Sequence, residues 1–275
     1  MIKKFWRGSL LLWSLIVILT LLACSKNQRD SIILAGSTSI QPFAERLTEV
    51  YSQKHKNFKF NVQGGGSSAG IKAVKNGVCH IGMSSRELKK EEKGLYEIVI
   101  AYDGIVIIVN QNNPLTNLTL NQVADIFAGK IKYWSELGET KSLKKNRFGR
   151  INVITREEGS GTRQSFEEIV MRKERIANDA LVQDSNGAVR EIVANDPNAI
   201  GYISYGLVDK RVKALSLDSV IPSVETIRQR KYPIVRSFLF LTKCPPRGKL
   251  KEFIDFVLSA EGQKLLQEEG LIPIR

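Results

Sequence analysis

The residues with the most specific chemistry lie in the turn Gly-Ser-Gly-Thr at residues 159–162, which Arg156 precedes. Residues 151–155 are mostly β-branched and favour a strand, whereas residues 166–171 have the apolar spacing of an amphipathic helix. N–H groups at the start of a helix have no intrahelical acceptor, so this turn and its hydroxyls can bind a small oxyanion. The guanidinium of Arg156 can bind two further oxygens. An ordinary N-capping turn beside a surface arginine would show the same pattern.

Three earlier turns rich in glycine, serine and threonine also follow predicted strands, at residues 36–39, 64–70 and 84–86. Helices are expected after the first two, at residues 42–51 and 71–75. Repeated β-turn-α units are typical of parallel sheets with helices on their faces. Ligands of such sheets bind beyond the carboxyl ends of the strands, which is where these turns are expected to lie.

Two further segments are predicted to carry the chain between domains. Strands at residues 98–101 and 105–109 flank Asp103, and the first crossing is expected after the second of them. The predicted strand at residues 199–205 marks the second crossing. Further helices are expected at residues 120–127, 188–193, 250–258 and 261–269.

The N-terminal segment has the pattern of a secretory signal. Basic residues precede an apolar run at residues 10–23, which is short for a membrane-spanning helix. The sequence Leu-Leu-Ala-Cys at residues 21–24 resembles the lipobox of bacterial lipoproteins, which implies that Cys24 is lipidated and becomes the first mature residue. A plain N-terminal anchor helix is the alternative, and both export the chain to a membrane surface. We therefore assign residues 1–23 to the signal and residues 24–30 to a polar tether.

Composition and charge are those of a globular protein with a basic surface. The chain has 275 residues, 43% of them hydrophobic, and a formal net charge of +13, which suits two domains of ordinary size. The lysines are scattered and no stripe of aromatic residues accompanies them, which argues against nucleic-acid binding. A basic surface also suits an anionic ligand or lipid.

Cysteine and histidine usage argues against a metal site. Cys-x-x-Cys is absent and His55 and His80 are the only histidines, so neither zinc nor another cofactor is expected. Export would permit a disulfide between Cys79 and Cys244, but two free thiols fit the sequence equally well.

One motif suggests an enzyme instead. Residues 66–70 match the Gly-x-Ser-x-Gly nucleophile elbow of hydrolases, with Ser68 as the nucleophile. That fold needs a histidine late in the chain, and His80 follows Ser68 too closely. Residues 64–69 also fit a relaxed dinucleotide pattern, but export argues against a nicotinamide enzyme.

The four turns, in their order and spacing, resemble those of the phosphate-binding protein of the bacterial high-affinity phosphate ABC transporter. Residues 120–131 with Trp134, and Ile200-Gly201-Tyr202, add to a resemblance that covers nearly all of the mature chain. The resemblance implies an α/β fold, a two-lobed clamshell of the periplasmic binding protein type II-like class with two interdomain crossings. We assign residues 31–108 and 204–275 to lobe I and residues 109–203 to lobe II.

The resemblance also implies the ligand contacts. Thr38 donates through its N–H and hydroxyl, Ser67 through its hydroxyl, and Glu158 orients the arginine. The expected phosphate-binding residues are Thr38, Ser39, Ser67, Ser85, Arg86, Asp103, Arg156, Ser160, Gly161 and Thr162.

The chain departs from the family at one position. Well-known members carry an aspartate after the predicted Ile81–Gly82 strand, where this chain has Ser85 followed by Arg86. A carboxylate there accepts the phosphate proton and repels proton-free sulfate. Asp103 is a candidate replacement, and a role as a turn or hinge residue fits it equally well.

Together these features predict an exported, lipid-anchored, monomeric protein that binds inorganic phosphate and delivers it to an ABC permease, without catalysis. Sulfate or molybdate capture is the alternative within binding proteins. A secreted serine hydrolase using Ser68 is the alternative from another class.

Overall fold

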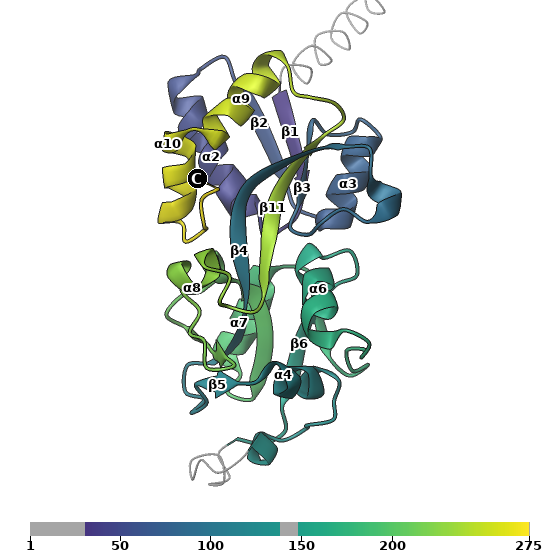
Figure 1. Ribbon diagram of the computed structural model, residues 1–275, viewed down its shortest axis with the longest axis vertical. Helices are drawn as coiled ribbons and strands as arrows, with labels where there is room; N and C mark the ends of the chain where they lie inside the picture. Colours follow the sequence, from purple (N-terminus) through teal and green to yellow (C-terminus); the bar gives the residue numbers. More distant parts are fainter. Residues whose placement is uncertain (1–30, 138–147, 275) are drawn as a thin grey trace, which may run out of the picture.

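The computed structural model describes residues 31–137 and 148–274 (Figure 1). Cys24, the signal and the tether therefore lie outside the described residues, as does most of the lysine-rich stretch before residue 150. Within the described part of the chain, no helix has both the length and the hydropathy needed to cross a bilayer.

Two long strands join the two halves of the molecule (Figure 1). β4 (Tyr96–Asn110) pairs antiparallel with β11 (Val235–Thr242) along its first part and with β8 (Ala199–Ser204) along its second. Gly104 pairs with Val235, whereas the next residue, Ile105, pairs with Ser204. The chain therefore passes between the lobes at residues 104–105 and again at residues 234–235.

The first lobe is a five-stranded sheet covered on both faces by helices. Its strands run in the order β2 (Lys59–Gln63), β1 (Ser31–Gly36), β3 (Ile81–Ser84), β11 and β4, and the first three are parallel. Phe43, Leu47 and Phe253 pack with the sheet in one core, and Ile71 and Val74 in another on the opposite face. These side chains come from α2 (Gln41–Lys54) and α9 (Gly248–Leu258) for the first core, to which α10 (Ala260–Glu268) adds Leu266, and from α3 (Ser67–Lys75) for the second.

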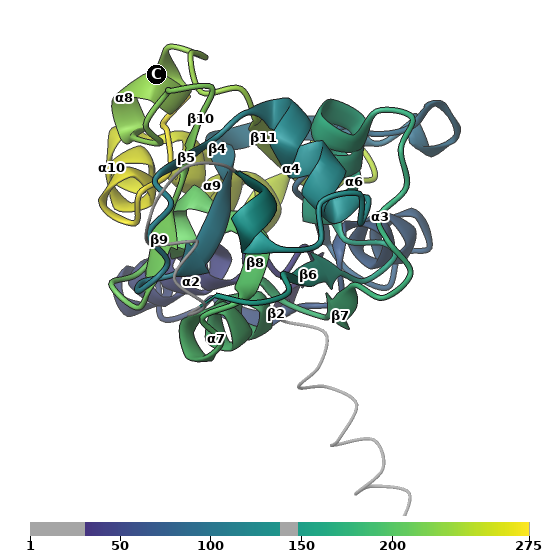
Figure 2. The ribbon, with the colours of Figure 1, turned by 90° about the horizontal axis from the view of Figure 1, so that it is seen from below.

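The second lobe continues the sheet through β8, β6 (Asn152–Arg156) and β7 (Leu181–Gln183), with β9 (Val212–Ala214) also on β4. α7 (Asn186–Asn195) lies on one face, and α4 (Leu120–Phe127) and α6 (Gly161–Phe166) lie on the other (Figure 2). Phe166 stacks on Tyr202 at 4.1 Å between ring centroids, which fixes α6 against β8.

Smaller elements are the π-helical segment Glu167–Met171, α8 (Val224–Arg228), and the paired strands β5 (Asn117–Leu118) and β10 (Ser216–Leu217). Single turns of 3₁₀-helix occur at Lys90–Glu92, Trp134–Leu137 and Tyr205–Leu207.

The predicted α/β clamshell with two crossings is confirmed, but the lobe boundaries differ from the prediction. Residues 105–108 and 204–234 were expected in lobe I, whereas Ile105, Val212 and Ile227 are buried in the core of the second lobe. β8 likewise pairs within the second lobe and is not the crossing. The predicted break at residues 102–104 is also absent from β4, because Arg236 pairs across the ladder with Asp103. The pairing register of the strands determines where the chain crosses between the lobes, and the local sequence does not encode that register.

Two details of the first lobe bear on the sequence predictions. α3 begins at Ser67, four residues before the predicted start, so Ser67 and Ser68 lie in its first turn. Cys79 is buried, Cys244 is exposed, and both are free thiols. Burial raises the pKa of Cys79 to about 11, which keeps this thiol protonated at neutral pH.

Candidate functional site

A cluster of buried polar side chains lies between the lobes, where the predicted turns meet. β1, β3 and β6 end here, and α3 and α6 begin here, so the site sits at the carboxyl ends of parallel strands as expected. The buried members that the sequence predicted are Ser39, Ser67, Ser85, Arg86, Asp103, Arg156, Ser160 and Thr162, while Thr38 is partly buried. Tertiary structure adds Ser37, Asn186, Ser204 and Arg236 to the buried cluster.

Three hydroxyls of the first lobe form a connected group. Ser37 Oγ donates to Ser85 Oγ at 2.9 Å, and the Ser85 N–H donates to Ser67 Oγ at 3.0 Å. Gly161 of the second lobe closes over this group: a Cβ there would lie 2.3 Å from Ser67 Oγ and 2.6 Å from Ser85 Oγ. Only glycine permits this approach, so the predicted turn at residue 161 reaches the serines directly.

Hydrogen bonds hold the two lobes together at the same place. Ser39 Oγ lies 2.7 Å from Thr162 Oγ1, and Arg156 Nη2 donates to Thr38 Oγ1 at 3.0 Å. The Ser68 N–H donates to the Gly159 carbonyl at 3.1 Å. Residues more than 90 positions apart in the chain thus meet through short polar contacts, so any ligand of these groups contacts both lobes.

Arg156 leaves one buried nitrogen without a partner among the described residues. Its Nε and Nη2 donate to the two carboxylate oxygens of Glu157, each at 2.9 Å, and Nη2 also donates to the Asp184 carbonyl. Nη1 is buried and makes no hydrogen bond within the described part of the chain. An unsatisfied buried donor on a charged group is costly, so Nη1 requires an acceptor of the kind an oxyanion supplies.

The carboxylate that orients Arg156 is Glu157, not Glu158. Glu158 is exposed, because it lies one residue further into the turn that follows β6. The Ser160 side chain caps α6 by accepting from the Arg163 N–H at 3.3 Å. The N–H groups of Gly161 and Thr162 then stand in the first turn, where a helix provides no acceptor for them.

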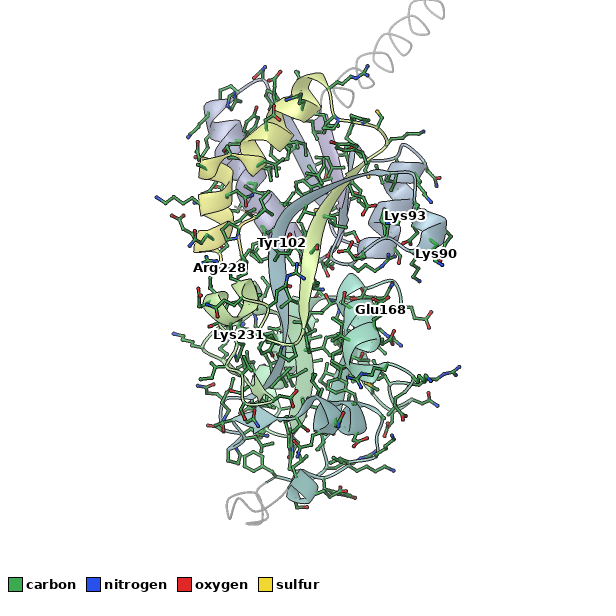
Figure 3. All side chains as sticks on the ribbon, in the orientation of Figure 1. Lys90, Lys93, Tyr102, Glu168, Arg228 and Lys231 are labelled. Atoms are coloured by element: carbon green, nitrogen blue, oxygen red, sulfur yellow. The ribbon has the colours of Figure 1, made fainter. Side chains whose placement is uncertain are left out.

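Arg86 is buried but is engaged within its own lobe. Its Nη1 and Nη2 donate to Glu92 at 2.6 and 2.8 Å, and Nη2 also donates to Ser68 Oγ. The hydrogen bond from Arg86 holds the pKa of Glu92 below its usual value, and burial partly opposes this effect. Lys90 and Lys93, which flank Glu92, point outward at the edge of the first lobe (Figure 3). We assign Arg86 to the support of this loop rather than to the ligand, contrary to the sequence prediction.

The carboxylate of Asp103 also accepts its hydrogen bonds from other groups of the protein. Oδ2 accepts from Arg236 Nε at 2.9 Å and from Nη2 at 2.7 Å, and Oδ1 accepts from Ser204 Oγ at 2.8 Å and the Tyr205 N–H at 3.2 Å. Four donors match the lone-pair sites of a carboxylate. Burial raises the pKa of Asp103, while Arg236, Ser204 and Tyr205 oppose that shift. This arrangement favours the hinge role over the acceptance of a phosphate proton.

Arg236 is the site residue that the sequence analysis missed. Its Nη1 donates to Thr162 Oγ1 at 2.8 Å and lies 3.4 Å from the Ser85 carbonyl oxygen. The available signal was the one charged residue in the largely apolar strand β11, because a buried arginine is almost always paired. Asn186 was missed as well, and its Nδ2 donates to Ser39 Oγ at 2.9 Å.

The arrangement can bind a tetrahedral oxyanion but offers no activated nucleophile at Ser68. Ser68 Oγ accepts from Arg86, and His80 Nδ1 accepts from the Ile33 N–H instead of approaching the serine. Within residues 31–137 and 148–274, no three histidine, cysteine or acidic side chains converge as metal ligands. Donors from two arginines, several hydroxyls and two helix starts dominate the cluster.

Comparisons with known proteins agree with this geometry. Residues 24–261 match the profile of the PBP superfamily domain. The chain is 32% identical over 267 residues to the phosphate-binding protein PstS of Borreliella burgdorferi, which covers 92% of this chain and 93% of that protein. It is 31% identical to the protein of the same name from Bacillus subtilis, over 89% of this chain and 81% of that one.

A solved structure from Clostridium perfringens superposes with a TM-score of 0.83 and 41% identity, covering 89% of this chain and all of that one. It is assigned as the substrate-binding protein of a phosphate ABC transporter and contains bound phosphate. An ABC-type phosphate transport receptor from Vibrio cholerae superposes with a TM-score of 0.72 and 39% identity, covering 88% of this chain and 99% of that chain.

Proposed function

Because the chain belongs to the PBP superfamily and, within it, to the PstS phosphate-binding proteins, we propose that it captures inorganic phosphate outside the cytoplasm and delivers it to an ABC permease. In this role the protein binds and releases its ligand as a monomer and does no chemistry. The lipobox-like sequence at residues 21–24 supports export and attachment of the mature chain through Cys24.

The observation that carries the proposal is the buried Nη1 of Arg156, which has no partner within the described part of the chain. Glu157 fixes the other side of the same guanidinium, so the unpaired edge has a defined direction. The Thr38 hydroxyl accepts from Nη2 of the same guanidinium, and α6 begins at Gly161 in the turn that follows Arg156. Charge-assisted bonds from arginine to phosphate oxygens, together with N–H donors at a helix start, satisfy these groups simultaneously.

We assign the phosphate contacts to Thr38, Ser39, Ser67, Ser85, Arg156, Ser160, Gly161 and Thr162. The first four come from the first lobe and the others from the second, so ligand oxygens would contact both lobes. A ligand that contacts both lobes binds more tightly when the lobes are together, so it would stabilise the closed arrangement.

Isothermal titration with phosphate, sulfate and molybdate tests the proposal. We expect saturable binding of phosphate at one site per chain. A chain that binds sulfate or molybdate but not phosphate would be a binding protein for the other anion. Ser85 in place of an aspartate keeps that alternative open, since a serine discriminates weakly between protonated and bare oxyanions. Turnover of a generic ester that Ser68→Ala abolishes would identify a hydrolase.

The lipid anchor has its own test. In cells that express the full chain, labelled fatty acid should be incorporated into the parent protein and not into Cys24→Ala. Persistent labelling of Cys24→Ala would exclude the cysteine as the attachment site. The matched control is Cys244→Ala, which removes the exposed thiol of the folded part and should leave the label unchanged.

A further inference from the structure

Arg236 and Asp103 lie at the two places where the chain passes between the lobes. Asp103 is one residue before the pair that closes the first-lobe ladder, Gly104 and Val235, and Arg236 is one residue after it. The two residues are direct partners in the β4–β11 register, and their side chains are 0% and 3% exposed. The ion pair therefore bridges the two connecting strands themselves.

The same arginine reaches a proposed ligand residue in the second lobe. Nε and Nη2 face Asp103, and this fixes Nη1 in the plane of the guanidinium, where it donates to Thr162 Oγ1 at 2.8 Å. Arg236 is thus held by the first lobe and bonded to the second. Its planar fork makes both contacts at once, which a lysine cannot do.

The bond from Arg236 determines what the Thr162 hydroxyl can offer. A hydroxyl whose oxygen accepts from a guanidinium must direct its own proton elsewhere. Ser39 Oγ, 2.7 Å from Thr162 Oγ1, is in the same position because it accepts from Asn186. One of these two hydroxyls donates to the other, so one proton remains for a third acceptor. Arg236 and Asn186 together make this pair of hydroxyls a net donor.

The charges of the cluster also favour a bound anion. Burial lowers the pKa of Arg236, Asp103 opposes this shift, and the positive charge of Arg156 lowers the pKa further. The positive charges of Arg156 and Arg236 therefore repel each other, and an anion bound near both would relieve that repulsion.

We propose that Arg236, anchored by Asp103 at the crossing between the lobes, is a positioning residue that fixes the linked Thr162 and Ser39 hydroxyls as a donor to the bound oxyanion. This inference rests on the proposed function, because it concerns the same site. It assigns Asp103 the role of holding an arginine in place of accepting a proton from the ligand.

The test separates ligand binding from folding. Arg236→Gln leaves Asp103 as a buried unpaired carboxylate and should lower both thermal stability and phosphate affinity. Asp103→Asn/Arg236→Gln removes both charges and should regain most of the lost stability. Its phosphate affinity should stay roughly 10- to 100-fold below that of the parent, the range expected for one hydrogen bond to a charged group. An affinity within threefold of the parent would overturn the proposal.

A double-mutant cycle with Thr162→Val then tests the route of the effect. If Arg236 acts through the Thr162 hydroxyl, Thr162→Val/Arg236→Gln should lose less affinity than the product of the two single losses. Independent losses that multiply would contradict the positioning role. Glu92→Gln is the matched control, because it removes the carboxylate partner of Arg86, a buried arginine that makes no hydrogen bond to Thr162 or Ser39. It should bind phosphate within threefold of the parent.

The outcomes for the two proposals are distinct. A parent protein that fails to bind phosphate in the same titrations would remove the proposed function and the inference together. A parent that binds phosphate, with a double variant Asp103→Asn/Arg236→Gln that binds equally well, would remove the inference alone.

Discussion

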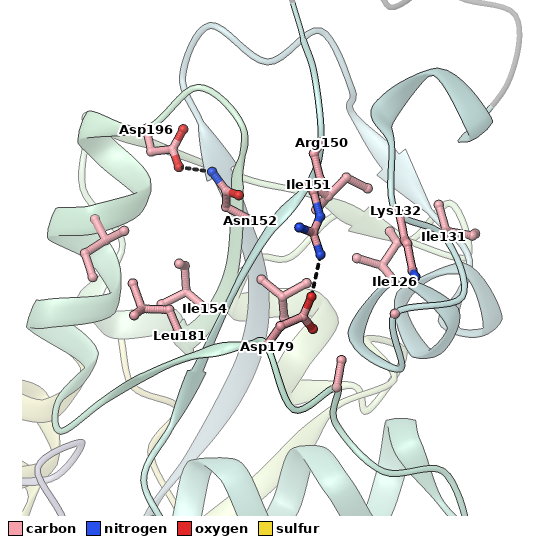
Figure 4. A pocket seen from close by; sticks show the side chains of 14 residues that line it. Ile126, Ile131, Lys132, Arg150, Ile151, Asn152, Ile154, Asp179, Leu181 and Asp196 are labelled. Carbon is pink, nitrogen blue, oxygen red and sulfur yellow. Dashed lines mark hydrogen bonds and ion pairs between the residues drawn. The ribbon is translucent and has the colours of Figure 1, made fainter.

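Two arginine–aspartate pairs of similar geometry lie in different regions of the molecule. Arg236 and Asp103 meet at 2.7 Å between the lobes, with side chains 3% and 0% exposed. Arg150 and Asp179 meet at 2.5 Å across a pocket on the outer side of the second lobe, with side chains 56% and 63% exposed (Figure 4). The distances alone would rank the outer pair as the stronger of the two.

Burial reverses that ranking. Water solvates each partner of the outer pair when the other is removed, so breaking an exposed pair costs little. Neither partner of the inner pair can be rehydrated without disrupting the packing between the lobes, so breaking it leaves an uncompensated charge. The outer pocket also has a floor of apolar side chains and no buried donor that lacks a partner. The proposed anion site is thus distinguished from the outer pocket by a buried charged donor without a partner, Arg156 Nη1, and not by the presence of a pocket.

The largest expected effect is on the inner pair. Asp103→Asn leaves Arg236 buried without its counter-charge and should lower the free energy of unfolding by about 3–5 kcal/mol, measured by urea denaturation. Phosphate and sulfate affinity should fall together, because the carboxylate is occupied by four protein donors and does not face the ligand. A phosphate-to-sulfate ratio that drops more than threefold would instead restore Asp103 as the acceptor of the phosphate proton.

The next effect concerns Arg156, whose buried edge lacks a partner. Arg156→Ala removes the charge-assisted contact and should weaken phosphate binding by about 2–5 kcal/mol, or roughly 30- to several-thousand-fold. Isothermal titration measures this loss, and thermal stability without ligand should change little. Arg150→Ala is the matched control, since it removes an exposed arginine of the same lobe. An affinity of Arg156→Ala within about threefold of the parent, under about 1 kcal/mol, would exclude Arg156 as the clamp.

The Arg86–Glu92 pair is intermediate, with side chains 1% and 17% exposed. The hydrogen bond from Arg86 holds the pKa of Glu92 below its ordinary value, so the folded state favours the ionised carboxylate. The stabilisation is therefore fully present above the ordinary glutamate pKa of about 4.3 and is lost as the pH falls through the lowered pKa. Glu92→Gln should be less stable than the parent at pH 7, by about 1 kcal/mol, and the difference should shrink towards pH 3. A difference that is constant from pH 7 to pH 3 would contradict this account.

The smallest effect is expected at the outer pair. Arg150→Ala and Asp179→Ala should each change the free energy of unfolding by less than about 1 kcal/mol, and 1 M salt should reduce the coupling between them further. Urea denaturation of both single variants and of the double variant measures this coupling. A coupling comparable to that of the inner pair would show that distance, and not burial, sets the strength of these contacts.

Much of the site followed from local sequence. The turns after β1, β3 and β6 and before α3 and α6 were located because glycine, serine and threonine follow β-branched runs and precede amphipathic ones. Arg156 was identified because it adjoins such a turn. The lobe boundaries and the partner of Arg156 were predicted less well, since the first depends on strand register and the second on how the turn after β6 directs Glu157 and Glu158.

The sequence by itself determined the α/β class, the order of the turns proposed to bind the ligand and the identity of the first arginine, because these depend on periodicity and on neighbours in the chain. Only the tertiary structure decided which charges are paired. Arg236 and Asp103 are 133 positions apart and meet because β4 and β11 run antiparallel in one register. A shift of that register by one residue would turn the Arg236 side chain to the other face of the sheet. Long-range pairing of this kind has no local signature, so the pairing of Arg236 with Asp103 emerged only from the folded chain.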